Sequence, residues 1–191
     1  MELLENMIKE KGQIIGDDIV KVDMFLNHQV DVNLMNEMGL EFKRLFSHKE
    51  ITKVLTLEVS GIAIAAFAAL HFNVPMVFAK KIASRNTGSD VYESEVYSFT
   101  KDTTYKIRVS KEYLSASDKV LIIDDFLANG KAMLGLIDLV NQAGAEVAGL
   151  GIAIEKNFQK GSDMLRKKGY ELHSLAIIDS IKNNTITFKH E

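Results

Sequence analysis

The chain has 191 residues, of which 47% are hydrophobic and 26% charged, a composition typical of one globular domain with a sizeable core. Its formal net charge of −3 argues against a general affinity for nucleic acid or membranes. The absence of cysteine excludes disulfides and thiolate metal sites, and the five histidines are too scattered to suggest a zinc site. Because residues 1–5 lack the features of a signal peptide, we expect a cytoplasmic protein.

The N-terminal region does not follow a regular pattern of strands and helices. Helices are predicted over residues 1–11 and 31–46, where apolar residues recur on one face. Residues 19–26, between them, are predicted to be extended. We expect residues 1–45 to form a small N-terminal cap over the functional site.

Strands and helices alternate along the rest of the chain. We predict strands over residues 53–57, 75–79, 120–123, 147–154, 172–178 and 185–188, and helices over 61–72, 132–143 and 160–168. The apolar helix 61–72 is too short to cross a bilayer. Residues 91–98 and 105–109 alternate enough to form a hairpin arm. This order predicts one α/β domain over residues 1–191, with a mainly parallel, doubly wound sheet.

The most informative segment runs from Val120 to Ala132. An apolar strand leads into Asp124 and Asp125, and a loop ending in Asn129-Gly130 precedes a helix. Ligands of parallel sheets bind at the carboxyl ends of the strands. There, two carboxylates can accept hydrogen bonds from vicinal hydroxyls, and the N–H groups of the loop and helix start can bind a phosphate. The segment therefore indicates a ribose 5-phosphate site, although paired acids also cap helices or bind Mg²⁺.

This segment resembles the diphosphate-sugar signature of type I phosphoribosyltransferases, and its loop is similar to that of the xanthine phosphoribosyltransferases. The resemblance implies that Asp124 and Asp125 hold the ribose hydroxyls. It also implies that backbone donors bind the 5'-phosphate from a run of five residues: Ala128, Asn129, Gly130, Lys131 and Ala132.

A second strand-to-helix turn is similar to the pyrophosphate loop of the same family. It comprises Glu58, Val59, Ser60 and Gly61, with Ser60 as the expected N-cap of the helix. Many ordinary turns contain Ser-Gly, so the turn alone is weak evidence. The resemblance also assigns Lys81 to the diphosphate. Residues 82–104 form a long polar excursion, which the family uses as a mobile hood over the site.

Three parts of the chain are candidates for contacting a purine base. Phe126 can stack on the base, and the ammonium of Lys156 can reach a carbonyl oxygen of the purine. By resemblance, Val20 and Asn27 contact the base from the cap. Taken singly, each has an ordinary explanation: Lys156 as a surface lysine, Asn27 as a turn residue and Val20 as a core residue.

The resemblance implies transfer of a phosphoribosyl group from 5-phosphoribosyl 1-diphosphate to xanthine, with Mg²⁺ as cofactor and a homodimer as the usual assembly. Enzymes acting on hypoxanthine, guanine or adenine are the nearest alternatives, because the acidic pair contacts only ribose. A regulator of the same fold and a Mg²⁺-dependent phosphohydrolase are more distant ones. The regulator would need a DNA-binding module, and the phosphohydrolase leaves the second loop unexplained.

Overall fold

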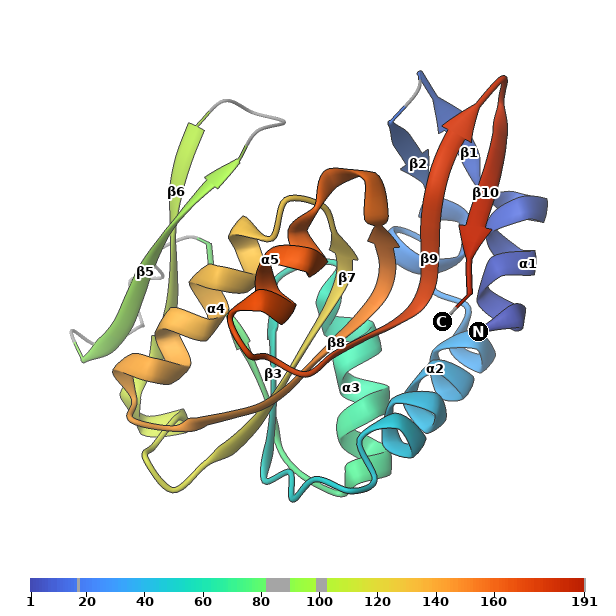
Figure 1. The fold of residues 1–191 in the computed structure, drawn as a ribbon. Coiled ribbons are helices and arrows are strands. Elements are labelled where there is room, and N and C mark those ends of the chain that lie inside the picture. Colours follow the sequence, from blue (N-terminus) through green and yellow to red (C-terminus); the bar gives the residue numbers. More distant parts are fainter. Residues whose placement is uncertain (17, 82–89, 99–102, 191) are drawn as a thin grey trace.

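The computed structural model describes residues 1–16, 18–81, 90–98 and 103–190 (Figure 1). Its centre is a six-stranded sheet with the order β10-β9-β8-β7-β3-β4, in which only the β9–β10 pairing is antiparallel. The strands are β3 (Lys53–Leu57), β4 (Met76–Ala79), β7 (Lys119–Leu127), β8 (Glu146–Lys156), β9 (Leu172–Lys182) and β10 (Thr185–Lys189). The predicted α/β fold with a mainly parallel sheet is confirmed.

Helices cover both faces of the sheet, because its central strands are apolar on both sides. In β7, Leu121 and Ile123 belong to one core cluster while Val120 and Ile122 belong to the other, as the two-residue period of a strand requires. The first cluster includes residues of α2 (Val32–Leu45) and α3 (Gly61–Phe72). The second includes residues of α4 (Lys131–Gln142) and α5 (Gly161–Lys167).

The N-terminal region packs on the first cluster through α1 (Glu2–Lys11) and the short hairpin of β1 (Gln13–Ile15) and β2 (Ile19–Lys21). The prediction of an extended segment over residues 19–26 is wrong beyond β2, because Asp23–Asn27 forms a turn of π-helix. Phe25 and Leu26 are both 1% exposed. Consecutive residues of a strand point to opposite faces, whereas the turn allows both side chains to enter the core.

The predicted hairpin arm is confirmed as β5 (Val91–Ser98) paired with β6 (Thr103–Ser110). It projects from one side of the sheet, opposite β1–β2 and the β9–β10 end (Figure 1). At Gly135 of α4, an added Cβ would lie 2.5 Å from Cγ2 of Val96, so the helix and hairpin are in close contact. The Gln142 side chain also donates to Glu93 O at 2.8 Å. Of the predicted hood, residues 82–89 and 99–102 lie outside the described residues.

Asp118 stabilises the end of the sheet that lies far from the strands' carboxyl ends. One of its oxygens accepts hydrogen bonds from Lys53 Nζ at 2.9 Å and from the Ser115 N–H at 2.8 Å. Burial opposes ionisation of Asp118, but the hydrogen bonds from Lys53 and Ser115 outweigh burial and lower its pKa. The stabilisation is therefore complete above the unfolded pKa of about 3.9 and is lost as the pH falls through the lower folded value.

We expect Asp118→Asn to lower the free energy of unfolding by about 1–3 kcal/mol at pH 7, because it removes a charged acceptor from a partly buried lysine. The difference from the unsubstituted protein should shrink as the pH approaches 3. Urea denaturation at several pH values measures it, with the exposed Asp163→Asn as the control. A difference that does not change with pH would contradict the assigned role of the Asp118 charge.

Candidate active site

The acidic pair lies within β7, not after it. The strand was predicted to end at Ile123, but it continues to Leu127 because its last residues pair with β8. On the other side, β3 pairs with β7 only as far as Ile122, so the strands diverge before the pair. Asp124 is 6% exposed and accepts a 3.1 Å hydrogen bond at Oδ1 from the Asp125 N–H. Burial and the charge of Asp125 raise the pKa of Asp124 well above its usual value.

The predicted phosphate loop follows β7 and leads directly into α4. Gly130 has φ of +81°, a left-handed conformation that favours glycine. The Asn129 side chain accepts a 3.1 Å hydrogen bond from the Lys131 N–H, and this closes the turn at the start of the helix. The loop thus lies at a helix N-terminus, where backbone donors and the helix dipole favour a bound phosphate.

The start of α5 packs against the backbone of this loop. The Gly161 N–H donates to Ala128 O at 3.0 Å, and a Cβ on Gly161 would lie only 2.3 Å from the same oxygen. Glu155, 1% exposed, accepts hydrogen bonds from Ser162 of α5 and, at 2.6 Å, from Ser174 of β9. These contacts of α5 with the loop and with Glu155 were not predicted from the sequence. The signal for them was Glu155 itself, an acidic residue at the end of the apolar run of β8.

The second predicted loop lies beside the acidic pair. The Glu58 N–H donates to Ala79 O at 3.1 Å, and Glu58 Oε1 accepts from the Lys81 N–H at 2.6 Å. A Cβ on Gly61 would lie 3.3 Å from Asp124 Oδ1. Residues 58–61, Lys81 and Asp124 are therefore brought together, as expected for one diphosphate-sugar site.

Two details of the second loop differ from expectation. Ser60 occupies the N-cap position of α3, but its side chain makes no capping hydrogen bond, because its backbone is helical rather than extended. Val59 is 74% exposed, so its side chain does not contribute to the core.

The four predicted base contacts lie on β7, β8 and the N-terminal region. The Lys156 ammonium lies 5.7 Å from the centre of the Phe126 ring and donates to Asp18 O at 2.7 Å. Burial lowers the pKa of Lys156. Asn27 Oδ1 is buried and has no hydrogen-bond partner among the described residues, so a ligand donor would relieve its desolvation. Val20, 5% exposed, belongs to the core.

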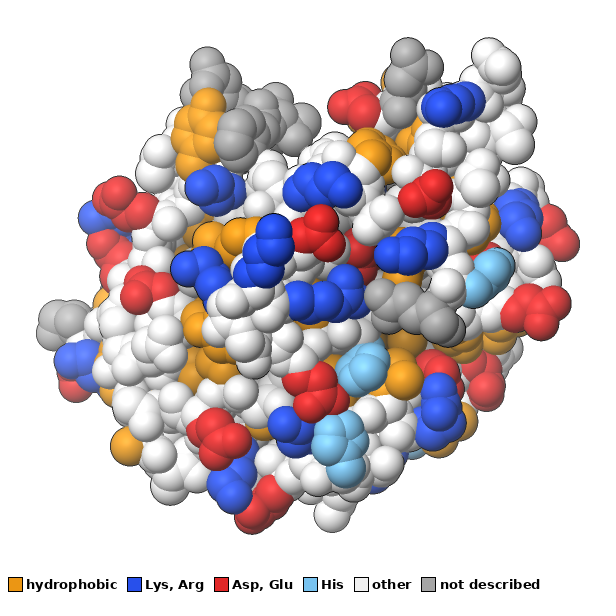
Figure 2. Space-filling view, in the orientation of Figure 1, with side chains coloured by type: hydrophobic (Ala, Val, Ile, Leu, Met, Phe, Trp, Pro, Cys, Tyr) orange, Lys and Arg blue, Asp and Glu red, His pale blue; other side chains and the backbone are white. Residues whose placement is uncertain are grey.

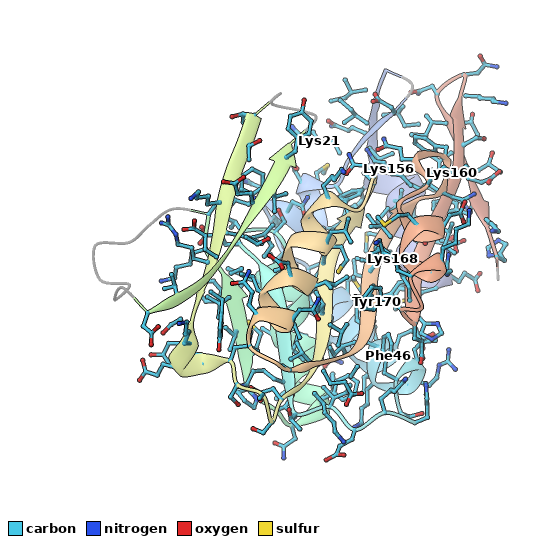
Figure 3. The ribbon with its side chains drawn as sticks, turned by 60° about the vertical axis from the view of Figure 1, so that its left-hand side comes forward. Lys21, Phe46, Lys156, Lys160, Lys168 and Tyr170 are labelled. Carbon is cyan, nitrogen blue, oxygen red and sulfur yellow. The ribbon has the colours of Figure 1, made fainter. Side chains whose placement is uncertain are left out.

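A cleft of about 370 Å³ connects the phosphate loop with Lys156 and the hairpin arm. Its lining includes Ala128, Asn129, Lys131, Ala132, Lys156 and the two tyrosines Tyr97 and Tyr105. Figure 2 shows several basic side chains gathered in the upper middle of this face, with an acidic side chain among them. Figure 3 shows Lys156 at the same end of the molecule as Lys21, and Lys168 farther from that end. The cleft is suited to an anionic ligand.

Within the described part of the chain, no group of three or more histidine, cysteine, aspartate or glutamate side chains is arranged to hold a metal ion. The carboxylate oxygens of Asp124 and Asp125 are the donor type that Mg²⁺ prefers. These two side chains could therefore hold a Mg²⁺ ion. None of the described helices is long and apolar enough to cross a membrane.

Comparisons with known proteins find relatives of high identity over nearly the whole chain. Xanthine phosphoribosyltransferase of Ruminiclostridium cellulolyticum is 61% identical over 188 residues, covering 98% of this chain and 99% of the relative. The enzyme of the same name from Clostridium novyi is 58% identical over 190 residues, covering all of both chains.

Solved structures show the same fold at low identity. Adenine phosphoribosyltransferase of Rhodothermus marinus superposes with a TM-score of 0.72 at 24% identity, over 93% of this chain and 100% of the other. The adenine enzyme of Trypanosoma brucei, in complex with AMP, pyrophosphate and ribose 5-phosphate, gives a TM-score of 0.75 at 19% identity, over 91% and 78% of the two chains. The family model of the phosphoribosyl transferase domain matches residues 33–191. The chain therefore belongs to the phosphoribosyl transferase family.

Proposed function

We propose that this chain converts xanthine and 5-phosphoribosyl 1-diphosphate into xanthosine 5'-monophosphate and diphosphate. The observation that carries the proposal is that the buried Asp124 lies beside the turn at Gly61 and feels the charge of Lys81, while the phosphate loop follows directly after Asp125 in the chain. The names of relatives that are 61% and 58% identical over nearly the whole chain support xanthine as the base.

In this proposal the acidic pair holds the ribose and stabilises its transition state. Asp124 and Asp125 accept hydrogen bonds from the 2'- and 3'-hydroxyl groups. As the bond to diphosphate breaks, the anomeric carbon gains positive charge, and nearby carboxylates favour that charge. Bound Mg²⁺ would neutralise part of the charge on the diphosphate leaving group.

Two loops bind the phosphate groups at opposite sides of the sugar. Residues 128–132 hold the 5'-phosphate through backbone N–H groups at the start of α4. Residues 58–61 and the Lys81 ammonium hold the diphosphate. Fixing both ends of the sugar aligns its anomeric carbon with the attacking purine nitrogen, and such positioning supplies much of the rate of this kind of reaction.

Lys156 and Phe126 form the proposed base site, with Asn27 and Val20 on the side of the N-terminal region. Phe126 stacks on the purine, and Lys156 donates to a carbonyl oxygen. Xanthine loses a proton readily near neutral pH, so a cation favours it over adenine, which has no carbonyl oxygen. The unpartnered Asn27 Oδ1 would accept a hydrogen bond from an N–H group of the base.

Replacing Lys156 with alanine should weaken xanthine binding about tenfold or more, because a charge-assisted hydrogen bond contributes roughly 1.5–3 kcal/mol. Binding of the diphosphate sugar should change little. Calorimetric titration of each ligand measures the two effects. Lys160→Ala is the matched control, since this neighbouring lysine is 71% exposed and pairs with Asp163. Equal weakening of both ligands by Lys156→Ala would remove the residue from base recognition.

The choice of base is tested by an absorbance assay with the diphosphate sugar, Mg²⁺ and each purine in turn. We expect xanthine to have the highest kcat/KM. Faster turnover of hypoxanthine, guanine or adenine would show that xanthine is not the preferred base. The chain would still be a purine phosphoribosyltransferase. Absence of transfer to any purine would favour a regulator or a phosphohydrolase.

We also propose that the chain forms a homodimer and acts in the cytoplasm. The proposed sugar substrate, 5-phosphoribosyl 1-diphosphate, carries several phosphate groups and does not cross membranes freely, which favours the compartment in which it is made. Leu70 of the strongly apolar helix α3 is 67% exposed in the single chain, and a second copy would cover it. Light scattering at several protein concentrations measures the assembly.

A further inference from the structure

The hairpin arm reaches the diphosphate side of the site at Tyr105. This residue lies in β6, opposite Val96 of β5, and its side chain is partly buried against the second core cluster. The backbone of Arg108, three residues later, exchanges hydrogen bonds of 2.9 and 3.0 Å with Lys80. The hairpin is thus joined to the chain immediately before Lys81. Tyr105 also lines the cleft that contains the phosphate loop.

The Lys81 ammonium lies 5.5 Å from the centre of the Tyr105 ring, within the range of a cation–π interaction. No carboxylate of a described residue forms an ion pair with this ammonium group. Lys81 and Tyr105 both lie near enough to Asp124 for electrostatic interactions with it to shift pKa values. The positive charge of Lys81 favours ionisation of Asp124, and burial together with the charge of Asp124 raises the pKa of Tyr105.

We propose that Tyr105 is a positioning residue whose ring holds the Lys81 ammonium at the diphosphate site. The inference rests on the proposed function, since it assigns Lys81 to the diphosphate. A lysine side chain has many rotamers, and ordering it costs free energy when the substrate binds. A ring fixed by the core reduces that cost. Unlike a carboxylate, the ring leaves the positive charge of Lys81 largely available to the diphosphate.

The hairpin offers a matched control for this arrangement. Tyr92 of β5 is also partly buried against the second core cluster, and the Lys111 ammonium lies 5.6 Å from its ring. The Lys111 ammonium is also paired with Asp90 at 2.7 Å, and Lys111 is not assigned to the diphosphate. Tyr92→Leu therefore reproduces the loss of a ring and of a cation–π contact on the same hairpin, without the proposed link to the diphosphate.

The experiment measures binding of 5-phosphoribosyl 1-diphosphate with Mg²⁺ by calorimetry to five variants: Tyr105→Leu, Tyr105→Phe, Lys81→Ala, the double variant Tyr105→Leu/Lys81→Ala, and Tyr92→Leu. We expect Tyr105→Leu to weaken binding about 3- to 30-fold, the range of a cation–π interaction. Tyr105→Phe should stay within about twofold, since it keeps the ring. In the double variant, Tyr105→Leu should add no further loss to that of Lys81→Ala.

Equal losses for the phenylalanine and leucine variants would overturn the inference, as would additive losses in the double variant. A loss of the same size in Tyr92→Leu would show a general effect of the hairpin and would also overturn it. Tyr105→Met replaces the leucine variant if the latter does not fold. If the unsubstituted chain bound no diphosphate sugar, the proposed function itself would fail, whereas normal binding with an unaffected Tyr105→Leu would reject the inference alone.

Discussion

Asp125→Asn should reduce the kcat for transfer about 10²–10³-fold, the usual cost of removing an electrostatic contact to a developing charge. The variant should fold normally, because Asp125 is only partly buried and asparagine has nearly the same shape. Its amide still hydrogen-bonds a hydroxyl group but carries no negative charge. The substitution therefore separates stabilisation of the ribosyl cation from simple recognition of the sugar.

Steady-state kinetics with xanthine, combined with calorimetric binding of the diphosphate sugar, measure this effect. The exposed Asp163→Asn on α5 is the matched control for a lost aspartate charge. We expect the loss to fall mainly on kcat, since the charge is most valuable in the transition state. A well-folded Asp125→Asn protein with near-normal turnover would exclude the carboxylate from the mechanism.

Gly61→Ala should lower kcat/KM about 100-fold, since displacing a catalytic group by about 1 Å can have this cost. An added Cβ would lie 2.1 Å from Thr56 Oγ1 and 3.3 Å from Asp124 Oδ1. Thr56 is fully buried and cannot turn away into solvent. The start of α3 must therefore move away from Thr56, and this displaces the turn that lies beside Asp124. We also expect a loss of about 1–3 kcal/mol in the free energy of unfolding from overpacking.

Kinetics and urea denaturation of Gly61→Ala test this prediction against Ala66→Ser, which adds one atom at an exposed position of the same helix. The double variant Thr56→Ala/Gly61→Ala removes the hydroxyl that the new methyl group would meet. It should recover part of the lost activity. Full activity in the single variant, or no recovery in the double one, would show that the close packing of this turn is not required.

The sequence alone predicted most of the architecture, because the signals for it are local. The strand over residues 53–57 and the helix over residues 61–72 agree with β3 and α3 at both ends. Gly144 and Gly169 have positive φ beyond the ends of α4 and α5. The proposed acidic pair and phosphate loop could also be suggested from the sequence, because both lie within the thirteen consecutive residues 120–132.

Only the tertiary structure decided features that depend on residues far apart in the chain. The turn at Asp23–Asn27 replaces an extended segment because the core accepts both Phe25 and Leu26. Pairing with β8 extends β7 to Leu127. The contact between Lys81 and Tyr105 joins residues with no recognisable pattern between them, because it depends on how the hairpin docks. Local periodicity specifies elements, whereas burial and docking between distant segments determine which side chains meet.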